Sequence, residues 1–227
     1  MTVTLCHPLQ SFLRIAGAAA ALLSVSWVCA QGLVFGDALL SRIEHDYGSA
    51  ARQRVVDLQR LIESAADLSE PGKLERVNAF FNRVHYDSDD VRWHEKDYWA
   101  TPFEVLGVNS ADCEDYALSK YFTLLSMGVD ESRLRITYVK SLELDEAHMV
   151  LAYYPATDAE PLILDNLTSE MALASEREDL VPVYSFNGVD LWLAMNKLEH
   201  QRIGSSDRLS RWQTYQTRLQ RQMSQTD

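Results

Sequence analysis

The spacing of apolar residues changes near residue 130, and this change limits the folds that the chain can adopt. Over residues 37–66 apolar residues recur every three or four positions, with a break at Gly48-Ser49, which predicts two helices. The same period predicts helices over 74–84 and from about 112 to 128. Later segments rich in Val, Ile, Leu and Tyr are predicted strands, namely 133–140, 147–154, 161–164 and 181–186. Helices followed by strands predict an α+β domain, with a helical N-terminal part packed on a largely antiparallel sheet.

Local signals refine this outline. Residues 69–72, Ser-Glu-Pro-Gly, are predicted to separate two helices. Thr101, Pro102 and Glu104 form the pattern of an N-cap, a first-turn proline and a capping box, so a short helix should begin there and end near Gly107. Residues 205–223 are polar and rich in Arg and Gln, which predicts a helix that packs lightly on the surface or extends as a tail.

The first 30 residues are predicted to be a signal peptide. Arg14 is followed by the apolar run 15–30, and Val28-Cys29-Ala30 fits a signal-peptidase site. The alternative is an uncleaved inner-membrane anchor that faces the periplasm, because the uncharged run approaches the ~20 residues needed to span a bilayer. Ser24 and Ser26 interrupt the run and favour cleavage. We therefore expect an exported protein with a signal peptide at 1–30, one domain at 31–204, and a polar C-terminal helix or tail at 205–227.

Charge and cysteine content narrow the function. The chain carries 33 acidic and 21 basic residues, and its net charge of −12 argues against nucleic acid or an anionic membrane surface as a partner. Of three cysteines, Cys6 and Cys29 fall in the predicted signal peptide, so Cys113 would be the only thiol of the mature protein. A lone thiol in an oxidising compartment is a liability unless it is used. Cys113 is therefore a candidate nucleophile.

The acidic neighbours of Cys113 need an explanation. The first turn of a helix favours the thiolate through its unpaired N–H groups and its dipole, but Asp112, Glu114 and Asp115 oppose it because negative charges raise the pKa of a thiol. Either Asp112 caps the helix while Glu114 and Asp115 complement its dipole, or a bound cation neutralises all three. Ligation by carboxylate oxygens would suit calcium. The residues alone leave both readings open.

His148 and Asp165 are candidates for a base and its orienting carboxylate. His148 lies near the start of a predicted strand, and Asp165 follows the next strand 17 residues later, so antiparallel pairing could bring them together. With Cys113 they would make a Cys–His–Asp triad. A structural strand histidine and a turn aspartate are the alternative. The spacing alone does not decide between them.

The segment 85–100 is polar and aromatic, and a solvated acidic loop is its simplest interpretation. Its carboxylates could instead help to bind a cation. Asp87-Ser88-Asp89-Asp90, however, lacks the Gly and the closing Glu of an EF-hand loop.

Four blocks of sequence, in this order, resemble the bacterial transglutaminase-like cysteine proteinases, and among them the LapG type of periplasmic protease. The similarity covers most of the chain after residue 30. The blocks are Asp-Tyr-Trp-Ala-Thr-Pro-Phe-Glu at 97–104, Asp-Cys-Glu-Asp-Tyr-Ala at 112–117, Ala-His-Met-Val-Leu at 147–151 and Leu-Asp-Asn at 164–166.

The resemblance implies a papain-like, transglutaminase-like fold with Cys113 on a central helix and His148 and Asp165 on the sheet. It implies that Cys113 is the nucleophile, that His148 is the general base and then the acid, and that Asp165 holds the imidazole. Within the active site, the backbone N–H of Cys113 is one natural oxyanion donor, and an indole from Trp93 or Trp99 is a second candidate.

The resemblance also implies calcium dependence, with Asp112, Glu114 and Asp115 at the acidic positions beside the nucleophile and any further ligands in the loop 85–99. The family's substrate is a large surface adhesin, which is cleaved near its N-terminus to release cells from a biofilm. Its controlling partner is an inner-membrane cyclic di-GMP receptor that sequesters the protease. We therefore expect a periplasmic, calcium-dependent cysteine endopeptidase with this substrate and this partner.

Two other functions remain as alternatives. If an amine replaced water in the second half of the reaction, the same residues would cross-link proteins, as a transglutaminase does. A non-catalytic periplasmic binding module is a second alternative. The presence of Cys113, His148 and Asp165 together argues against it, because a binding module has no need of all three.

Overall fold

The structure is a computed structural model that describes residues 33–224. The predicted signal peptide, its cleavage site and the alternative anchor lie outside the described residues. Within residues 33–224, no helix combines the length and the hydropathy needed to cross a membrane.

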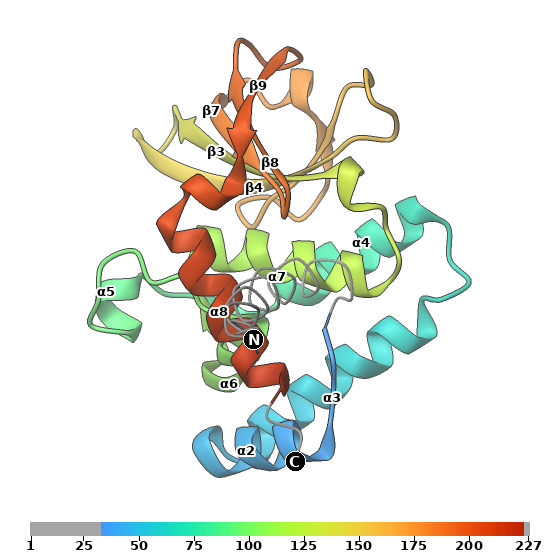
Figure 1. The fold of residues 1–227 in the computed structure, drawn as a ribbon, viewed down its shortest axis with the longest axis vertical. Coiled ribbons are helices and arrows are strands. Elements are labelled where there is room, and N and C mark those ends of the chain that lie inside the picture. Colours follow the sequence, from blue (N-terminus) through green and yellow to red (C-terminus); the bar gives the residue numbers. More distant parts are fainter. Residues whose placement is uncertain (1–32, 225–227) are drawn as a thin grey trace, which may run out of the picture.

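A helical part and a sheet form two layers of the fold (Figure 1). The helices are α2 (Asp37–Tyr47), α3 (Ser49–Ser64), α4 (Glu70–Phe81), α5 (Asp89–Arg92), α6 (Pro102–Val108), α7 (Cys113–Ser126) and α8 (Ser210–Ser224). The strands are β1 (His85–Tyr86), β2 (Ser110–Ala111), β3 (Leu134–Ser141), β4 (Glu146–Tyr153), β5 (Leu162–Leu164), β6 (Ala172–Leu173), β7 (Leu180–Phe186), β8 (Asp190–Ala194) and β9 (His200–Ser205). Strands β3–β9 form one antiparallel sheet in the order β6-β5-β4-β3-β7-β8-β9, whereas β1 and β2 pair in parallel elsewhere. The predicted α+β class is confirmed.

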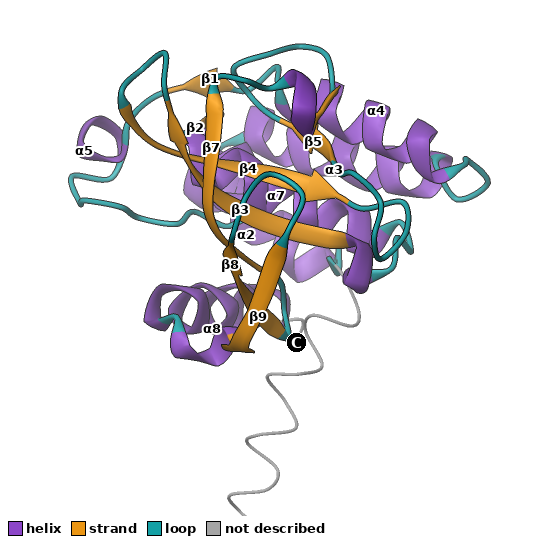
Figure 2. Ribbon diagram, turned by 90° about the horizontal axis from the view of Figure 1, so that it is seen from above, coloured by secondary structure: helices purple, strands orange, loops and turns teal. Residues whose placement is uncertain are grey.

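Helix α7 is the centre of the molecule. Every residue from Glu114 to Leu124 is buried, because α7 packs against β3 and β4 on one side and against α4 and α6 on the other (Figures 1 and 2). A helix that is buried all round cannot be shifted or rotated without opening the core. The residues at its N-terminus are therefore held rigidly against the sheet.

The predicted helix boundaries are confirmed at most positions. The capping box exists, because Glu104 N–H donates to Thr101 Oγ1 at 3.2 Å and Thr101 N–H donates to Glu104 Oε2 at 2.8 Å. The predicted separator at 69–72 is wrong. Helix α4 begins at Glu70 after Ser69, and it accommodates Pro71 because backbone N–H groups of a first turn have no partner within the helix.

Helix α8 is part of the core, and the predicted light packing is wrong. Three of its apolar side chains, Trp212, Tyr215 and Leu219, are at most 1% exposed. Trp212 stacks on Phe122 of α7 with ring centroids 5.8 Å apart. Figure 1 shows α8 running from the sheet along the helical layer. Although most residues of α8 are polar, its apolar residues form one stripe that faces the core, and composition alone does not reveal this stripe.

This packing predicts a large loss of stability when Trp212 is truncated. Trp212→Ala should lower the free energy of unfolding by about 3–5 kcal/mol, because a fully buried indole leaves a cavity. Urea unfolding followed by circular dichroism measures this change. Arg221→Ala, at an exposed position of the same helix, is the control and should stay within about 0.5 kcal/mol of the wild type. Equal urea midpoints of unfolding for the two variants would show that α8 is not part of the hydrophobic core.

Candidate active site

Cys113 is the first residue of α7, and Asp112 occupies the N-cap position. The side chain of Asp112 makes no capping hydrogen bond, and its buried Oδ1 has no hydrogen-bond partner among the described residues. The expected N-cap position of Asp112 is confirmed, although no side-chain capping hydrogen bond accompanies it. In this structure the Cys113 thiol donates to Glu114 Oε2 at 3.0 Å.

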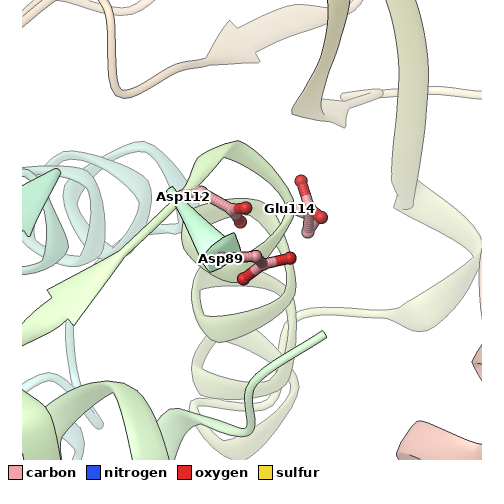
Figure 3. Close-up of side chains that lie close together, drawn as sticks. All are labelled: Asp89, Asp112 and Glu114. Carbon is pink, nitrogen blue, oxygen red and sulfur yellow. The ribbon is translucent and has the colours of Figure 1, made fainter. Parts of the chain in front are cut away.

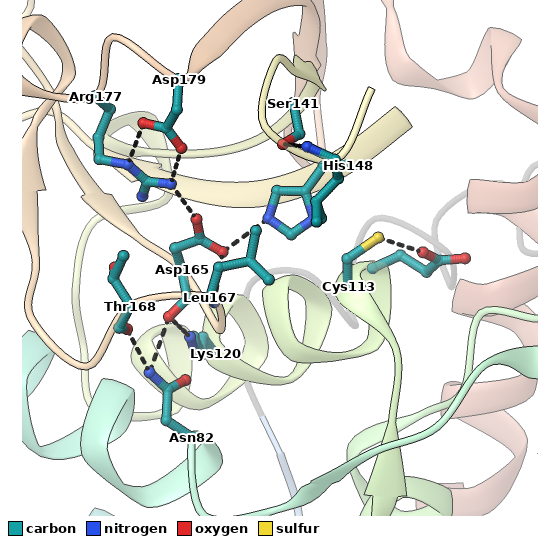
Figure 4. Close-up of polar contacts among 12 residues, drawn as sticks. Asn82, Cys113, Lys120, Ser141, His148, Asp165, Leu167, Thr168, Arg177 and Asp179 are labelled. Carbon is teal, nitrogen blue, oxygen red and sulfur yellow. Dashed lines mark hydrogen bonds and ion pairs between the residues drawn. The ribbon is translucent and has the colours of Figure 1, made fainter. Parts of the chain in front are cut away.

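His148 and Asp165 meet on the sheet, as their spacing allowed. Strands β4 and β5 are antiparallel neighbours with Leu151 opposite Leu164, so β4 and the end of β5 bring the two side chains together. His148 Nε2 lies 2.8 Å from Asp165 Oδ1, and both residues are buried. Because a carboxylate can only accept, Nε2 carries the proton and Nδ1 is the free ring nitrogen. Figure 4 shows the imidazole between Asp165 and Cys113.

The surroundings of Asp165 keep its carboxyl group ionised. Burial alone would raise its pKa, but the hydrogen bonds from His148 and Arg177 hold that pKa well below its ordinary value. Arg177 Nη2 donates to Asp165 Oδ2 at 2.7 Å. The backbone oxygen of Asp165 accepts from Asn82 Nδ2 at 2.9 Å and from the buried Lys120 Nζ at 3.0 Å. Sequence reasoning had assigned no role to Asn82, Lys120 or Arg177.

Cys113 and His148 line one cleft with a volume of about 440 Å³. The other lining residues are Asp97, Trp99, Glu114, Tyr138, Ala147, Met149, Tyr184 and Arg211. Arg211 comes from α8 and forms a 2.7 Å ion pair with Asp97 at the cleft. A helix predicted to be peripheral therefore contributes a side chain to the site.

The two tryptophans considered as oxyanion donors are engaged elsewhere. Trp99 lines the cleft, but its indole Nε1 donates to Asp97 Oδ1 at 2.8 Å. The ring of Trp93 packs on that of Tyr98, with centroids 4.7 Å apart, and Trp93 does not line the cleft. The backbone N–H of Cys113, at the first position of α7, remains the oxyanion donor that the geometry supports.

A cluster of carboxylates lies beside the thiol. One oxygen each from Asp89, Asp112 and Glu114 lies within 4.8 Å of the others (Figure 3). Asp89, at the start of α5, is buried, so the solvated-loop interpretation fails at this residue. Asp115 does not belong to this group of three. Its Oδ1 accepts from the backbone N–H of Ala100 at 2.6 Å, and its buried Oδ2 has no partner among the described residues.

The electrostatics of this cluster favour a positive ion. Burial and then the neighbouring carboxylates raise the pKa of Asp112 to about 9, and burial raises the pKa of Asp89 to about 6. Burial also raises the pKa of Asp115 well above its ordinary value. Burial and the Glu114 carboxylate raise the pKa of the Cys113 thiol. Buried carboxylate oxygens without partners fit a hard divalent cation, which would reverse these shifts.

Comparisons with known proteins agree with the fold. Residues 52–197 match the model of the bacterial transglutaminase-like cysteine proteinase family. LapG from Legionella pneumophila is 40% identical over 83% of this chain and 99% of that chain, with a TM-score of 0.72. The EGTA-treated structure of the same protein gives the same identity and coverage, with a TM-score of 0.73. Its calcium-bound structure is 42% identical over 79% of this chain and 97% of that chain, with a TM-score of 0.69. No curated protein sequence matched significantly.

Proposed function

The chain belongs to the bacterial transglutaminase-like cysteine proteinases, and on this basis we propose that it is a calcium-dependent cysteine endopeptidase with a Cys113–His148–Asp165 triad. The observation that carries the triad is the cleft, which Cys113 and His148 both line while Asp165 holds the far nitrogen of the imidazole. Three residues of the types needed for acyl transfer thus converge from α7, β4 and the end of β5.

The triad would act in two half-reactions. His148 Nδ1 takes the proton of Cys113, and the sulfur attacks a backbone carbonyl carbon of the substrate. The Cys113 backbone N–H stabilises the resulting oxyanion. His148 then protonates the departing amine, which leaves an acyl group on Cys113 as a thioester. Water loses a proton to His148, attacks the thioester and restores the thiol.

Calcium would be held by Asp89, Asp112 and Glu114, with Asp115 as a further candidate. A bound divalent cation supplies positive charge beside the nucleophile and so favours the thiolate. A Glu114 carboxylate that held the ion would be a poorer acceptor for the Cys113 thiol, and His148 would be the acceptor left for the thiol proton. The calcium-bound structure of the related Legionella protein supports calcium as the ion, and the carboxylate cluster supports the choice of ligands.

The proposed substrate is the N-terminal region of a large surface adhesin, and the proposed inhibitory partner is an inner-membrane cyclic di-GMP receptor. Both follow from the resemblance of this chain to LapG-type proteases, as does the proposed periplasmic location. Loss of the adhesin from the cell surface would release cells from a biofilm.

Cleavage of a purified adhesin N-terminal fragment tests this function. We expect wild-type protein to produce two fragments in calcium and none in excess EGTA. A labelled primary amine in the same reaction distinguishes hydrolysis from cross-linking, because only a transglutaminase would attach the label to the substrate. An intact, unlabelled fragment after incubation with folded, calcium-loaded protein would contradict the proposal.

The raised pKa values predict that calcium binding releases protons. At pH 7, Asp112 is largely protonated in the metal-free protein because its pKa is about 9, so each ion should displace roughly one to two protons. Isothermal titration calorimetry in buffers of different ionisation enthalpy measures this number. A heat that is independent of the buffer would contradict it.

The same shifts predict how stability varies with pH. The folded-state pKa of Asp112 lies above its ordinary value of 3.8, so the metal-free folded state binds more protons than the unfolded state. The free energy of unfolding of the metal-free protein should therefore fall as the pH rises from about 4 toward 9, and bound calcium should reverse this trend. Thermal melts across this range, with and without calcium, measure the effect.

A further inference from the structure

The carboxylate of Asp165 is the centre of a buried network. Its Oδ1 contacts His148 Nε2 at 2.8 Å and accepts from Leu167 N–H at 3.2 Å, and its Oδ2 accepts from Arg177 Nη2 at 2.7 Å. Arg177 in turn donates to Asp179 through Nε at 2.9 Å and through Nη2 at 2.7 Å. Figure 4 shows the resulting chain from His148 through Asp165 and Arg177 to Asp179.

We propose that Arg177 and Asp179 are positioning residues, which hold the Asp165 carboxylate in the orientation that fixes the His148 imidazole. This inference rests on the proposed function, because it gives both residues a role in the same reaction. Neither residue lines the cleft, so neither can contact the substrate there.

The burial of the network explains why the Asp165 carboxylate needs the positively charged guanidinium group of Arg177 beside it. Asp165 is 1% and Arg177 6% exposed, and a buried carboxylate facing only a neutral imidazole would be a poorly compensated charge. Arg177 supplies the positive charge, and its planar group also fixes the direction of the bond. Asp179 engages two guanidinium nitrogens and thereby leaves Arg177 a single orientation.

The backbone of Asp165 is held separately from its carboxylate. Its carbonyl oxygen accepts from Asn82 and Lys120, at 2.9 and 3.0 Å, and neither bond involves Arg177. Loss of Arg177 should therefore release the side-chain torsion of Asp165 without displacing the residue. The expected consequence is an imidazole with a broader range of orientations, which affects the chemical step and not substrate binding.

A second cavity, beside Arg177, offers room for a free guanidinium ion to replace the side chain that Arg177→Ala removes. Arg177 lines a cavity of about 30 Å³ that shares no lining residue with the cleft, and its Nη1 has no hydrogen-bond partner among the described residues. Truncation to alanine would extend this cavity by the volume of the guanidinium group. A free guanidinium ion could then occupy the space and restore the bond to Asp165.

Kinetics of four variants test the role of Arg177. Relative to wild type, Arg177→Ala should lower kcat roughly 10- to 100-fold, because a misoriented catalytic group costs about this much, with KM changed less than about twofold. Arg177→Lys and Asp179→Asn should show smaller losses of kcat. Arg202→Ala is the matched control, since it removes an exposed Arg–Asp pair of 2.6 Å to Asp190, and its kcat should equal that of wild type.

Two further measurements distinguish a positioning role of Arg177 from a purely structural one: rescue of Arg177→Ala by free guanidinium, and the energetic coupling of Arg177→Ala with Asp165→Asn. Millimolar guanidinium chloride, far below denaturing concentrations, should restore part of the kcat of Arg177→Ala and none of the kcat of Asp165→Asn. In the Asp165→Asn background, Arg177→Ala should cause little further loss, because both act through one bond. Additive losses without rescue, or wild-type kcat in all Arg177 and Asp179 variants, would overturn the proposal.

The proton on His148 Nε2 gives a readout that needs no substrate. We expect its proton NMR resonance to shift, and its exchange with water to quicken, in Arg177→Lys and Asp179→Asn but not in Arg202→Ala. These two conservative variants also serve if Arg177→Ala does not fold. An unchanged resonance in both overturns the positioning role. A changed resonance in a protein that lacks Cys113-dependent cleavage supports the positioning role and contradicts the proposed function.

Discussion

Replacement of Cys113 by alanine is expected to abolish cleavage of the adhesin fragment. The loss should be roughly 10⁴- to 10⁶-fold in kcat, because removal of a nucleophile leaves only binding and the oxyanion donor. The melting temperature should change little, since Cys113 is at the partly exposed surface of the cleft. The measurement is single-turnover cleavage with enzyme in excess over substrate.

The control for this variant is Glu143→Ala, in the exposed turn between β3 and β4, which should cleave at the wild-type rate. Cys113 is the only cysteine in residues 33–224, so alkylation of the described part of the chain should reproduce the loss. Full activity in Cys113→Ala would show that another group is the nucleophile.

Removal of calcium is expected to abolish activity and to lower stability together. A ligand at 100 times its dissociation constant stabilises a folded protein by about 2.7 kcal/mol, so chelation should lower the melting temperature by several degrees. Asp89→Asn removes one charge from the proposed site and should weaken calcium binding roughly 10- to 100-fold. Calorimetric titration and thermal melts measure both effects.

Asp90→Asn is a matched control, because Asp90 is adjacent in sequence and exposed. It removes the same charge from the chain without touching the carboxylate cluster, so its calcium affinity should remain close to that of wild type. Equal affinities for Asp89→Asn and Asp90→Asn would place the ion elsewhere. An unchanged melting temperature and activity after exhaustive chelation would contradict calcium dependence altogether.

The spacing and the number of apolar residues predicted the parts of the fold that are richest in them. The four strands in the middle of the sheet and the central helix are rich in apolar residues, and their positions are confirmed within one or two residues. The hairpin of β8 and β9 was missed, because β9 reads His-Gln-Arg-Ile-Gly-Ser and is largely exposed. Such a strand is held by pairing with its neighbour, which leaves little trace in hydropathy.

The residues of the candidate site could also be predicted only where the local sequence marks them. The spacing of His148 and Asp165 allowed them to be neighbours, because adjacent antiparallel strands can bring together residues 17 positions apart, and the family resemblance implied that they act as a pair. Asp89 was not assigned, because the run 87–90 contains three aspartates and only the backbone of α5 decides which one turns inward. Arg177 lies in a loop 12 residues after Asp165, and nothing local marks it as a partner of that carboxylate.

Acyl transfer through Cys113 can be detected by mass spectrometry of a reaction that is stopped in acid. Calcium-loaded protein is mixed with the adhesin fragment, quenched within one turnover, and its intact mass and peptides are measured. We expect a covalent adduct with the mass of the N-terminal product on the peptide that contains Cys113, and no adduct in EGTA. Cleavage without an adduct, or an adduct on another residue, would contradict acyl transfer through Cys113.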